Sequence, residues 1–578
     1  MSTSQATGKF VTGAPILIEP RYLNLIDLLS KRLFRIPQYQ RAYSWGKKER
    51  ADMFEDIRAL KSAPETTFHF MATIVGLRRD TTTIVTDKFN VIEVVDGQQR
   101  LTTLVVLLKA IQKKLDRSLT TNMKLVTELG ELLVKQDDVS LILLQTNHDN
   151  NRYFIEYVRN GTVPDLTIAT TLADRETIQS FIDCERFVDT WTDKVELLRI
   201  IKNQLTFIFH ELSEESTVYT VFEVLNNRGL NVSWLDRLKS MLMSIAFEEH
   251  GGNFEEHLTE LHEVWTKIYQ AIGLRQGLST ESMRFAATLR SKDAASKPFG
   301  EEKAVDLLRN CKTAAAAIEV SSWLLKVTIA VNKFLEDTKG TREAVTTIAQ
   351  ARLLAIAILL RDFPQSEQTQ LLDAWEKTTF RIFGLCRKDA RTAVGDYVRL
   401  ARDLFNTKLS ATVAVKQIRE LSANKEHSID WAEAQIRNEN CYEGWEDELR
   451  YLMFRYEEHL SKQAGQKFSN EQWSRIWQAS SVQSIEHIWP ASKGSQKPVD
   501  DKSDQIFVHR LGNLVLLPPG LNKSLQDREP KEKAEAYIKT GLNIAAEVGE
   551  IIQTSGWGPA QVKEREERIV QWIKETWV

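Results

Sequence analysis

Apolar residues recur with two different periods along the chain, and the changes of period divide it into three parts. In the first part, helical spacing is interrupted by strand-like runs at residues 70–77, 90–95 and 204–212. From residue 238 to about residue 421, helical spacing continues almost without a break. Near the end, two short apolar runs are joined by a polar loop and followed by a helix-like segment. The pattern predicts a multidomain, mainly α protein with α+β parts, and domains at residues 1–240, 241–425 and 426–578.

Polar residues stand at the joints of the last part. The first apolar run ends at Glu486 and His487, the second opens on Asn513, and Asn522 follows before a helix-like segment at residues 531–542. Strand, loop, strand and helix in this order, with such residues at the joints, are typical of a ββα-metal nuclease. The alternative is a polar β-hairpin whose histidine only satisfies hydrogen bonds in the core.

Hydrolysis of a phosphodiester explains why these residue types would occur together. The reaction needs a deprotonated water, a stabilised phosphorane charge and a held leaving oxygen, which one divalent metal and one neutral imidazole can supply. We expect His487 to be the general base, since an imidazole has a pKa near neutrality, and Asn513 to orient it. Mg²⁺ and Mn²⁺ take oxygen ligands, so Glu486 and Asn522 are the expected metal ligands. Three lysines of the loop would hold a DNA backbone without reading its sequence: Lys493, Lys497 and Lys502.

An Asp-Gly turn joins a predicted strand to a predicted helix in the first part. The strand at residues 90–95 ends at Asp96-Gly97, and the helix continues to residue 115. A helix N-terminus presents free N–H groups and the positive end of the helix dipole, which suits phosphate. Five side chains after the turn could bind phosphate, cap the helix or reach a metal: Gln98, Gln99, Arg100, Thr102 and Thr103. The alternative is a plain turn followed by a surface arginine. The sequence has no Gly-rich Walker motif, which excludes a P-loop.

Both ends of the chain resemble GmrSD-type restriction endonucleases, a modification-dependent (type IV) family. The C-terminal resemblance rests on Glu-His-Ile-x-Pro from residue 486, Leu-Gly-Asn-Leu from residue 511 and the later Asn522. The N-terminal resemblance rests on residues 35–45 and on Asp-Gly-Gln-Gln-Arg at residues 96–100. It implies a ParB/sulfiredoxin-like N-terminal α+β domain, a helical middle and an HNH-like C-terminal nuclease domain. Two positions depart from the family pattern, because Asn522 replaces a histidine and Glu486 stands where aspartate is common.

The resemblance also implies that the N-terminal domain binds and hydrolyses a nucleotide, GTP or ATP, and thereby controls the nuclease. A third family-like stretch at residues 221–239 would bring Asn226, Arg228, Asp236 and Lys239 towards the same pocket. The alternative there is a helix-turn-helix in which Arg228 and Asp236 only pair. The residues expected to bind the nucleotide are Asp96, Gly97, Gln98, Gln99, Arg100, Thr102, Thr103, Arg35, Gln40, Arg41, Asn226, Arg228 and Lys239.

Composition and charge limit the class of protein. The net charge of −3 gives no global signal for nucleic acid, so DNA contacts must come from local basic surfaces. The four cysteines are scattered without a Cys-x-x-Cys pair, which argues against structural zinc and a disulfide framework and fits a reducing cytoplasm. The first residues lack the apolar core of a signal peptide, and no uninterrupted apolar run is long enough to span a bilayer. We therefore expect a cytoplasmic protein without a membrane partner.

Two classes of function remain. The first is an enzyme: a metal-dependent DNA endonuclease or nickase of phage defence, gated by nucleotide, whose target by resemblance is modified phage DNA. The second is a nucleotide-regulated sensor that binds modified DNA but cleaves little. HNH-like chemistry also leaves open an RNA-directed nuclease, because hydrolysis can act on either backbone. A homodimer would suit double-strand cleavage, which needs two single-metal sites.

Overall fold

The computed structural model describes most of the chain. The described residues are 20–37, 40–135, 142–146, 151–212, 233–248, 254–275, 277–292, 295–338, 345, 347–407, 409–438, 440–466, 476–477, 479–491 and 508–577.

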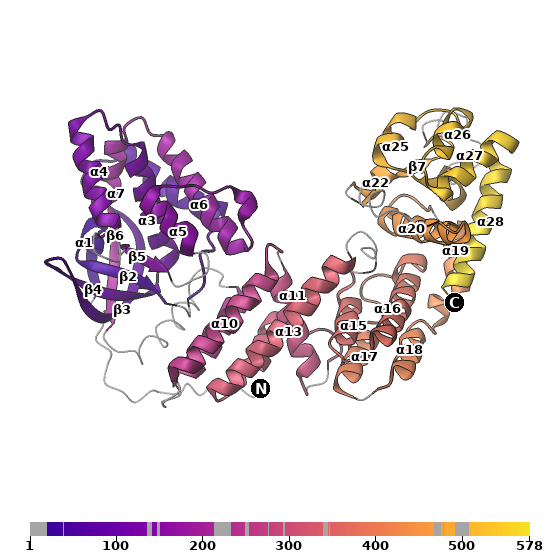
Figure 1. Ribbon diagram of the computed structural model, residues 1–578, viewed down its shortest axis with the longest axis horizontal. Helices are drawn as coiled ribbons and strands as arrows, with labels where there is room; N and C mark the ends of the chain where they lie inside the picture. The colour runs from indigo at the N-terminus through magenta and orange to yellow at the C-terminus, as the bar shows by residue number, and fades with distance from the viewer. Residues whose placement is uncertain are drawn as a thin grey trace, which may run out of the picture. The chain divides into compact units, whose positions relative to one another are not determined.

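The chain divides into two compact units. The first, here the N-terminal unit, comprises Met1–Ser279 and Leu308–Leu325, and the second, the C-terminal unit, comprises Thr280–Leu307 and Lys326–Val578. Helices make up most of both units, and a mixed sheet lies in the first (Figure 1). A mainly α, multidomain protein with α+β parts is therefore confirmed, while the finer division into three domains stays a prediction.

A six-stranded mixed sheet forms the centre of the N-terminal unit. Its order is β1-β6-β3-β4-β2-β5, with β3 antiparallel to β4 and parallel to β6. The three predicted strands are present as β3, β4 and β6, whereas the shorter β1, β2 and β5 carry too few residues for a clear period. The strands are β1 (Pro20–Asn24), β2 (Arg32–Ile36), β3 (His69–Ile84), β4 (Asp87–Asp96), β5 (Leu144–Thr146) and β6 (Leu205–Leu212).

Helix α3 (Gln98–Lys114) is the core helix of this unit. This helix lies against helices α4, α5 and α6, and its apolar side chains belong to the same hydrophobic core as those of the sheet (Figure 1). Its fully buried residues include Leu101, Leu104, Val105 and Leu108. The other helices of the unit are α1 (Leu25–Leu29), α2 (Lys47–Ala59), α4 (Thr120–Leu133), α5 (Asn151–Asn160), α6 (Leu172–Asp189), α7 (Lys194–Asn203), α9 (Trp234–Glu248) and α10 (Phe254–Ile272).

Glycine is required where β4 turns into α3. Gly97 has a φ of 88°, and a Cβ there would lie 2.4 Å from Ile74 Cδ1 and 2.9 Å from the carbonyl oxygen of Thr73. Any L side chain would meet both the unfavourable φ and this contact. The predicted strand, Asp-Gly turn and helix are thus confirmed, and the turn is tight because it packs on β3.

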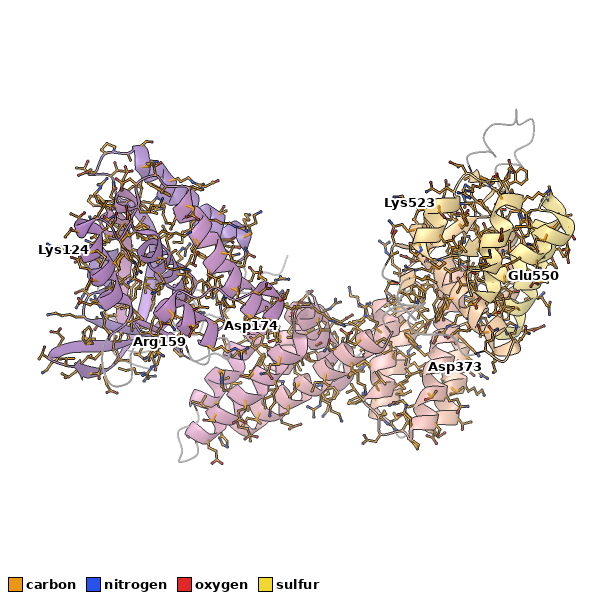
Figure 2. The ribbon with its side chains drawn as sticks, turned by 45° about the horizontal axis from the view of Figure 1, so that its top comes forward. Lys124, Arg159, Asp174, Asp373, Lys523 and Glu550 are labelled. Carbon is orange, nitrogen blue, oxygen red and sulfur yellow. The ribbon has the colours of Figure 1, made fainter. Side chains whose placement is uncertain are left out.

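The C-terminal unit consists mainly of amphipathic helices, and the boundaries between the two units fall within α11, α12 and α13. Charged residues such as Lys523 and Glu550 lie exposed on outer helix faces, as Lys124 does in the first unit (Figure 2). The helices are α11 (Leu278–Arg290), α12 (Glu301–Leu308), α13 (Ala314–Thr338), α15 (Ala349–Leu359), α16 (Gln365–Thr379), α17 (Val394–Asn406), α18 (Ala411–Glu420), α19 (Ile429–Asn438), α20 (Glu446–Gln463), α22 (Ser481–Ser484), α25 (Pro519–Leu525), α26 (Pro530–Ile538), α27 (Asn543–Ser555) and α28 (Pro559–Thr576).

One helix meets the length and apolarity required of a membrane span. In α13 the window Ala314–Glu336 has a mean hydropathy of 1.5, and half of it is buried inside the protein. Glu319, Lys326 and Lys333 interrupt this helix, so it does not contradict the expectation that no uninterrupted apolar run is long enough to span a bilayer. A single half-buried helix of this kind is weak evidence for a span, since core helices pass the same test.

A two-stranded antiparallel sheet lies near the end of the C-terminal unit. Strand β7 (Ile485–His487) pairs with β8 (Leu514–Leu516), and α25 and α26 follow, so the predicted order of strand, strand and helix is present. Just before β8, a Cβ on Gly512 would lie 2.0 Å from the carbonyl oxygen of Val562 in α28. Only glycine allows the last helix to pack this closely.

Candidate functional site

A pair of histidines lies at the end of β7. His487 Nε2 is 3.1 Å from His509 Nδ1, and the ring of Tyr442 contacts both imidazoles. Burial, together with smaller effects of His509 and Lys533, lowers the pKa of His487 to about 3. The imidazole is therefore neutral at pH 7, which is the form that a general base requires.

Glu486, next to His487, is paired with a buried lysine. Lys533 Nζ donates to Glu486 Oε1 at 2.6 Å and also to the carbonyl oxygens of His487 (2.8 Å) and Gln526 (2.9 Å). Burial raises the pKa of Glu486 to about 7 although Lys533 opposes that shift. The sequence does not mark Lys533 as a site residue, because nothing in the spacing of α26 distinguishes it from the exposed Lys531 and Lys539 on the same segment.

The side chain of Asn513 holds backbone and not the imidazole. Its Oδ1 accepts from the Trp489 N–H (2.9 Å) and the Trp557 indole (3.2 Å), and its Nδ2 donates to the carbonyls of Trp489 (3.1 Å) and Val508 (2.9 Å). These four bonds use the whole amide. The prediction that Asn513 orients His487 is corrected, since among the described residues His509 contacts that ring by a hydrogen bond and Tyr442 by ring packing.

The side-chain amide of Asn522 is fixed through its nitrogen. Its Nδ2 donates to the carbonyls of Gln483 (2.8 Å) and Ile485 (3.0 Å), which fixes the amide and leaves Oδ1 without a hydrogen bond among the described residues. The described part of the chain contains no group of three or more His, Cys, Asp or Glu placed to hold a metal. Mg²⁺ keeps several waters and takes one or two protein oxygens, so Glu486 and Asn522 fit a hard divalent cation and not a zinc-type site.

In the N-terminal unit, the two glutamines after the Asp-Gly turn hold a neighbouring segment. Gln98 Nε2 donates to Gln40 Oε1 and to the Arg41 carbonyl, both at 3.1 Å. Gln99 Oε1 accepts from the Ser44 N–H at 2.8 Å, and its Nε2 donates to the Ala42 carbonyl at 3.2 Å. Both side chains are buried. The structure thus gives them a bracing role in place of the predicted direct contact with a nucleotide.

The other residues of this motif divide between core and surface. Thr102 and Thr103 are buried, and Thr103 bonds to the Gln99 carbonyl and the Tyr43 hydroxyl, so it neither caps the helix nor reaches a ligand. Arg100 lies over the ring of Trp45. Burial raises the pKa of Asp96, and the nearby Arg100 and Arg41 oppose that shift.

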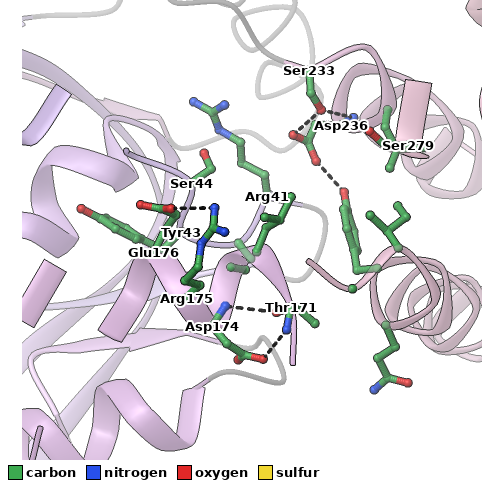
Figure 3. A pocket seen from close by; sticks show the side chains of 18 of the residues that line it. Arg41, Tyr43, Ser44, Thr171, Asp174, Arg175, Glu176, Ser233, Asp236 and Ser279 are labelled. Carbon is green, nitrogen blue, oxygen red and sulfur yellow. Dashed lines mark hydrogen bonds and ion pairs between the residues drawn. The ribbon is translucent and has the colours of Figure 1, made fainter. Parts of the chain in front are cut away.

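A pocket of about 710 Å³ lies beside residues 40–44, the segment that Gln98 and Gln99 hold. It is lined by Arg41 to Ser44, the start of α6, and side chains of α9 and α10, including Asp236 and Lys239. Figure 3 shows Arg41 between the Thr171–Glu176 group and Asp236 in that view. No hydrogen bond or ion pair to the Arg41 side chain occurs among the described residues.

The predicted nucleotide-binding residues are therefore only partly brought together. Arg41, Asp236 and Lys239 line the pocket, and Gln40 lies next to it with its carbonyl 3.4 Å from Lys239 Nζ. Arg35 is exposed on β2 and does not line the pocket. Five predicted residues lie outside the described part of the chain: Asn226, Arg228, Lys493, Lys497 and Lys502.

Two family comparisons define the class of this protein. The GmrSD restriction endonuclease N-terminal domain matches residues 25–243, and the GmrSD restriction endonuclease C-terminal domain matches residues 426–572. The chain is thus a restriction-type endonuclease, with DNA as its substrate. It belongs to the GmrSD restriction endonuclease family, which confirms the resemblance seen in the motifs. A comparison with individually curated proteins gives no match.

Proposed function

We propose that this endonuclease hydrolyses DNA phosphodiesters at the Glu486–His487 site with the help of a divalent metal. The observation that carries the proposal is the half-buried, neutral imidazole of His487 directly beside the buried carboxyl group of Glu486. A neutral base next to an oxygen ligand for a cation is the combination that phosphodiester hydrolysis needs. Its target, by family, is modified DNA of an invading phage.

Each residue of the site has a separate role in the proposed hydrolysis. His487 removes a proton from the attacking water, whose oxygen bonds to phosphorus while the bond from phosphorus to the leaving oxygen breaks. Glu486 and Asn522 would hold Mg²⁺ or Mn²⁺, which when bound neutralises the charge that develops on the phosphate. Lys533 anchors Glu486 and the backbone of His487, and Asn513 anchors the backbone around Trp489.

The proposal assigns regulation to a nucleotide in the pocket of the N-terminal unit. Its volume suits a ligand of nucleotide size, and Arg41 offers a guanidinium that no residue of the described chain pairs. A guanidinium can donate two parallel hydrogen bonds to one phosphate group, so Arg41 would be the main contact with the phosphates of the nucleotide. GTP or ATP bound there, and its hydrolysis, would control cutting. Gln98 and Gln99 support this contact indirectly by fixing the Arg41 backbone.

Cleavage of plasmid DNA tests the nuclease part. Unmodified and phage-modified plasmids are incubated with Mg²⁺ or Mn²⁺, with and without GTP or ATP. We expect cutting of modified DNA only, changed by nucleotide, and a rate roughly 10²- to 10⁴-fold lower in His487→Ala because the general base is lost. The matched control is His459→Ala, a half-buried histidine of the same unit that packs on Tyr456 and Trp572 away from the pair.

Each other outcome has a defined meaning. Undiminished metal-dependent nicking by His487→Ala would contradict the catalytic assignment. Cutting of every DNA would contradict modification dependence, and cutting of RNA alone would replace the substrate. Equal loss in His459→Ala and His487→Ala would indicate a folding defect in place of a catalytic one.

A further inference from the structure

The hydrogen bond between His487 and His509 has a preferred direction. One ring must donate through its N–H and the other must accept through a lone pair, and the two tautomers of each ring decide which. The far nitrogen of His509, Nε2, lies 4.0 Å from Glu443 Oε1. A carboxylate favours the N–H on the nitrogen that faces it. His509 Nδ1 therefore carries the lone pair, and His487 Nε2 is the donor.

A single turn holds this arrangement in place. The turn lies between α19 and α20, and Asn440 Oδ1 accepts from the N–H groups of Tyr442 (2.8 Å) and Glu443 (3.0 Å). The Cys441 N–H donates to the carbonyl oxygen of His509 at 3.0 Å, which ties the turn to the histidine that it faces. The backbone of Glu443 is therefore fixed beside His509, and Asn440 Nδ2 donates to Oε2 of its largely exposed carboxylate at 3.1 Å.

The Tyr442 ring fixes the angle between the two imidazoles. It stacks on His509 with ring centres 5.6 Å apart and planes 8° apart, and it meets His487 edge-on at 4.6 Å and 67°. Neither imidazole can rotate away without losing this packing. The lone pair of His509 thus stays directed at His487 Nε2.

We propose that His509 sets the tautomer of His487, with the proton on Nε2 and the basic lone pair on Nδ1. Nδ1 of His487 has no hydrogen bond among the described residues, so it is the nitrogen that meets the attacking water. The inference rests on the proposed role of His487 as the base. His509 is a positioning residue, because it accepts a hydrogen bond from the base and does not touch the reacting atoms.

Three substitutions of His509 separate this role from simple packing. His509→Asn would place an amide oxygen close to the position of Nδ1, His509→Gln would move that oxygen outward, and His509→Leu would remove the acceptor while keeping bulk. We therefore expect the Asn variant to keep kcat within about tenfold and the Leu variant to lose roughly 10²- to 10⁴-fold in kcat at unchanged KM, with the Gln variant between them. Equal kcat in the Asn and Leu variants would overturn the proposal. If the Leu variant does not fold, Asn against Gln makes the same comparison.

A spectroscopic measurement gives a readout that needs no cleavage. In the full-length protein labelled with ¹⁵N-histidine, the ring nitrogens of His487 are assigned by comparison with His487→Ala. We expect a protonated Nε2 and a bare Nδ1 in the wild type and in His509→Asn, and a mixture of tautomers in His509→Leu. A wild-type His487 protonated on Nδ1 would overturn the inference. Because this result does not depend on DNA cutting, it stays decisive even if the proposed nuclease activity fails its own test.

Discussion

The polar motifs of the two units differ in how far their charged groups are removed from water. In the C-terminal unit, Glu486 and Lys533 are buried together, and burial shifts the pKa values of Glu486 and His487 in opposite directions. In the N-terminal unit, Arg41 borders an open pocket. The difference matches the two roles proposed above, proton transfer for the C-terminal motif and recognition of a charged nucleotide for the N-terminal motif.

The same motifs are alike in one respect. In each, amide side chains form most of their hydrogen bonds with backbone groups: Gln98 and Gln99 hold the segment before α2, and Asn513 holds the backbone around Trp489. Loss of such a buried amide leaves several backbone groups without partners. A motif read from sequence therefore contains both residues that meet a ligand and residues that position them.

The largest effect is expected where the buried charge pair is broken. Lys533→Met leaves the Glu486 carboxylate and two backbone carbonyls without their donor, so we expect a loss of about 3 to 5 kcal/mol in the free energy of unfolding at pH 8. Denaturant unfolding measures it. The control is Lys531→Met on the same helix, an exposed residue whose replacement should change stability by less than about 0.5 kcal/mol. Equal stabilities for the two variants would show that Glu486 does not depend on Lys533.

The opposite pKa shifts of Glu486 and His487 predict opposite pH dependences of stability. A raised carboxyl pKa of about 7 means that the folded state binds more protons, so this contribution falls as the pH rises from about 4.5 to 7. A histidine pKa lowered to about 3 means that the unfolded state binds more protons, so that contribution rises from pH 3 to about 6.5. Each slope is at most about 1.4 kcal/mol per pH unit, and between pH 4.5 and 6.5 they cancel.

Single substitutions separate the two slopes. Between about pH 4.5 and 6.5, Glu486→Gln should become more stable as the pH rises and His487→Gln less stable, while the double variant should follow the wild type. Unfolding monitored by tryptophan fluorescence at several pH values gives the comparison. Parallel curves for the two single variants would show that burial does not shift these groups in opposite directions.

A smaller effect than the loss of the buried charge pair is expected in the open pocket of the N-terminal unit. Arg41→Gln should weaken binding of GTP or ATP by about 1.5 to 3 kcal/mol, or roughly ten- to a hundredfold, because a charge-assisted phosphate contact is lost. Titration calorimetry measures it. Arg35→Gln is the matched control, since Arg35 is exposed outside the pocket and should bind nucleotide as the wild type does. A loss in Arg35→Gln alone would place the nucleotide elsewhere.

Local sequence patterns predicted the parts of the fold that depend on neighbouring residues. The strands β3, β4 and β6, the Asp96-Gly97 turn and the order of strand, strand and helix after Glu486 all follow from periods and turn residues. The membership in a restriction endonuclease family could also be predicted, because its motifs are short and contiguous.

Contacts between distant parts of the chain could not be predicted in this way. Lys533 lies 46 residues after His487 in sequence, yet its ammonium group is 2.8 Å from the His487 carbonyl. Thr103 was expected at a ligand because it follows the turn, but one helical turn from Gln99 its side chain already faces the core. The packing of α26 and α3 against the rest of the protein determines where the side chains of Lys533 and Thr103 lie. This packing cannot be predicted from the residues next to them in a single sequence.

The closeness of α28 to Gly512 has a consequence for the backbone beside His487. Arg565, fully buried in α28, donates to the carbonyl oxygens of Gly512 (2.9 Å) and Leu514 (2.7 Å), the residues on either side of Asn513. Helix α28 therefore fixes the backbone on both sides of Asn513, the residue that holds the chain around Trp489. A truncation that removes α28 would take the donor away from both carbonyls, so the backbone beside His487 would lose its support although Glu486, His487, Asn513 and Asn522 were all still present.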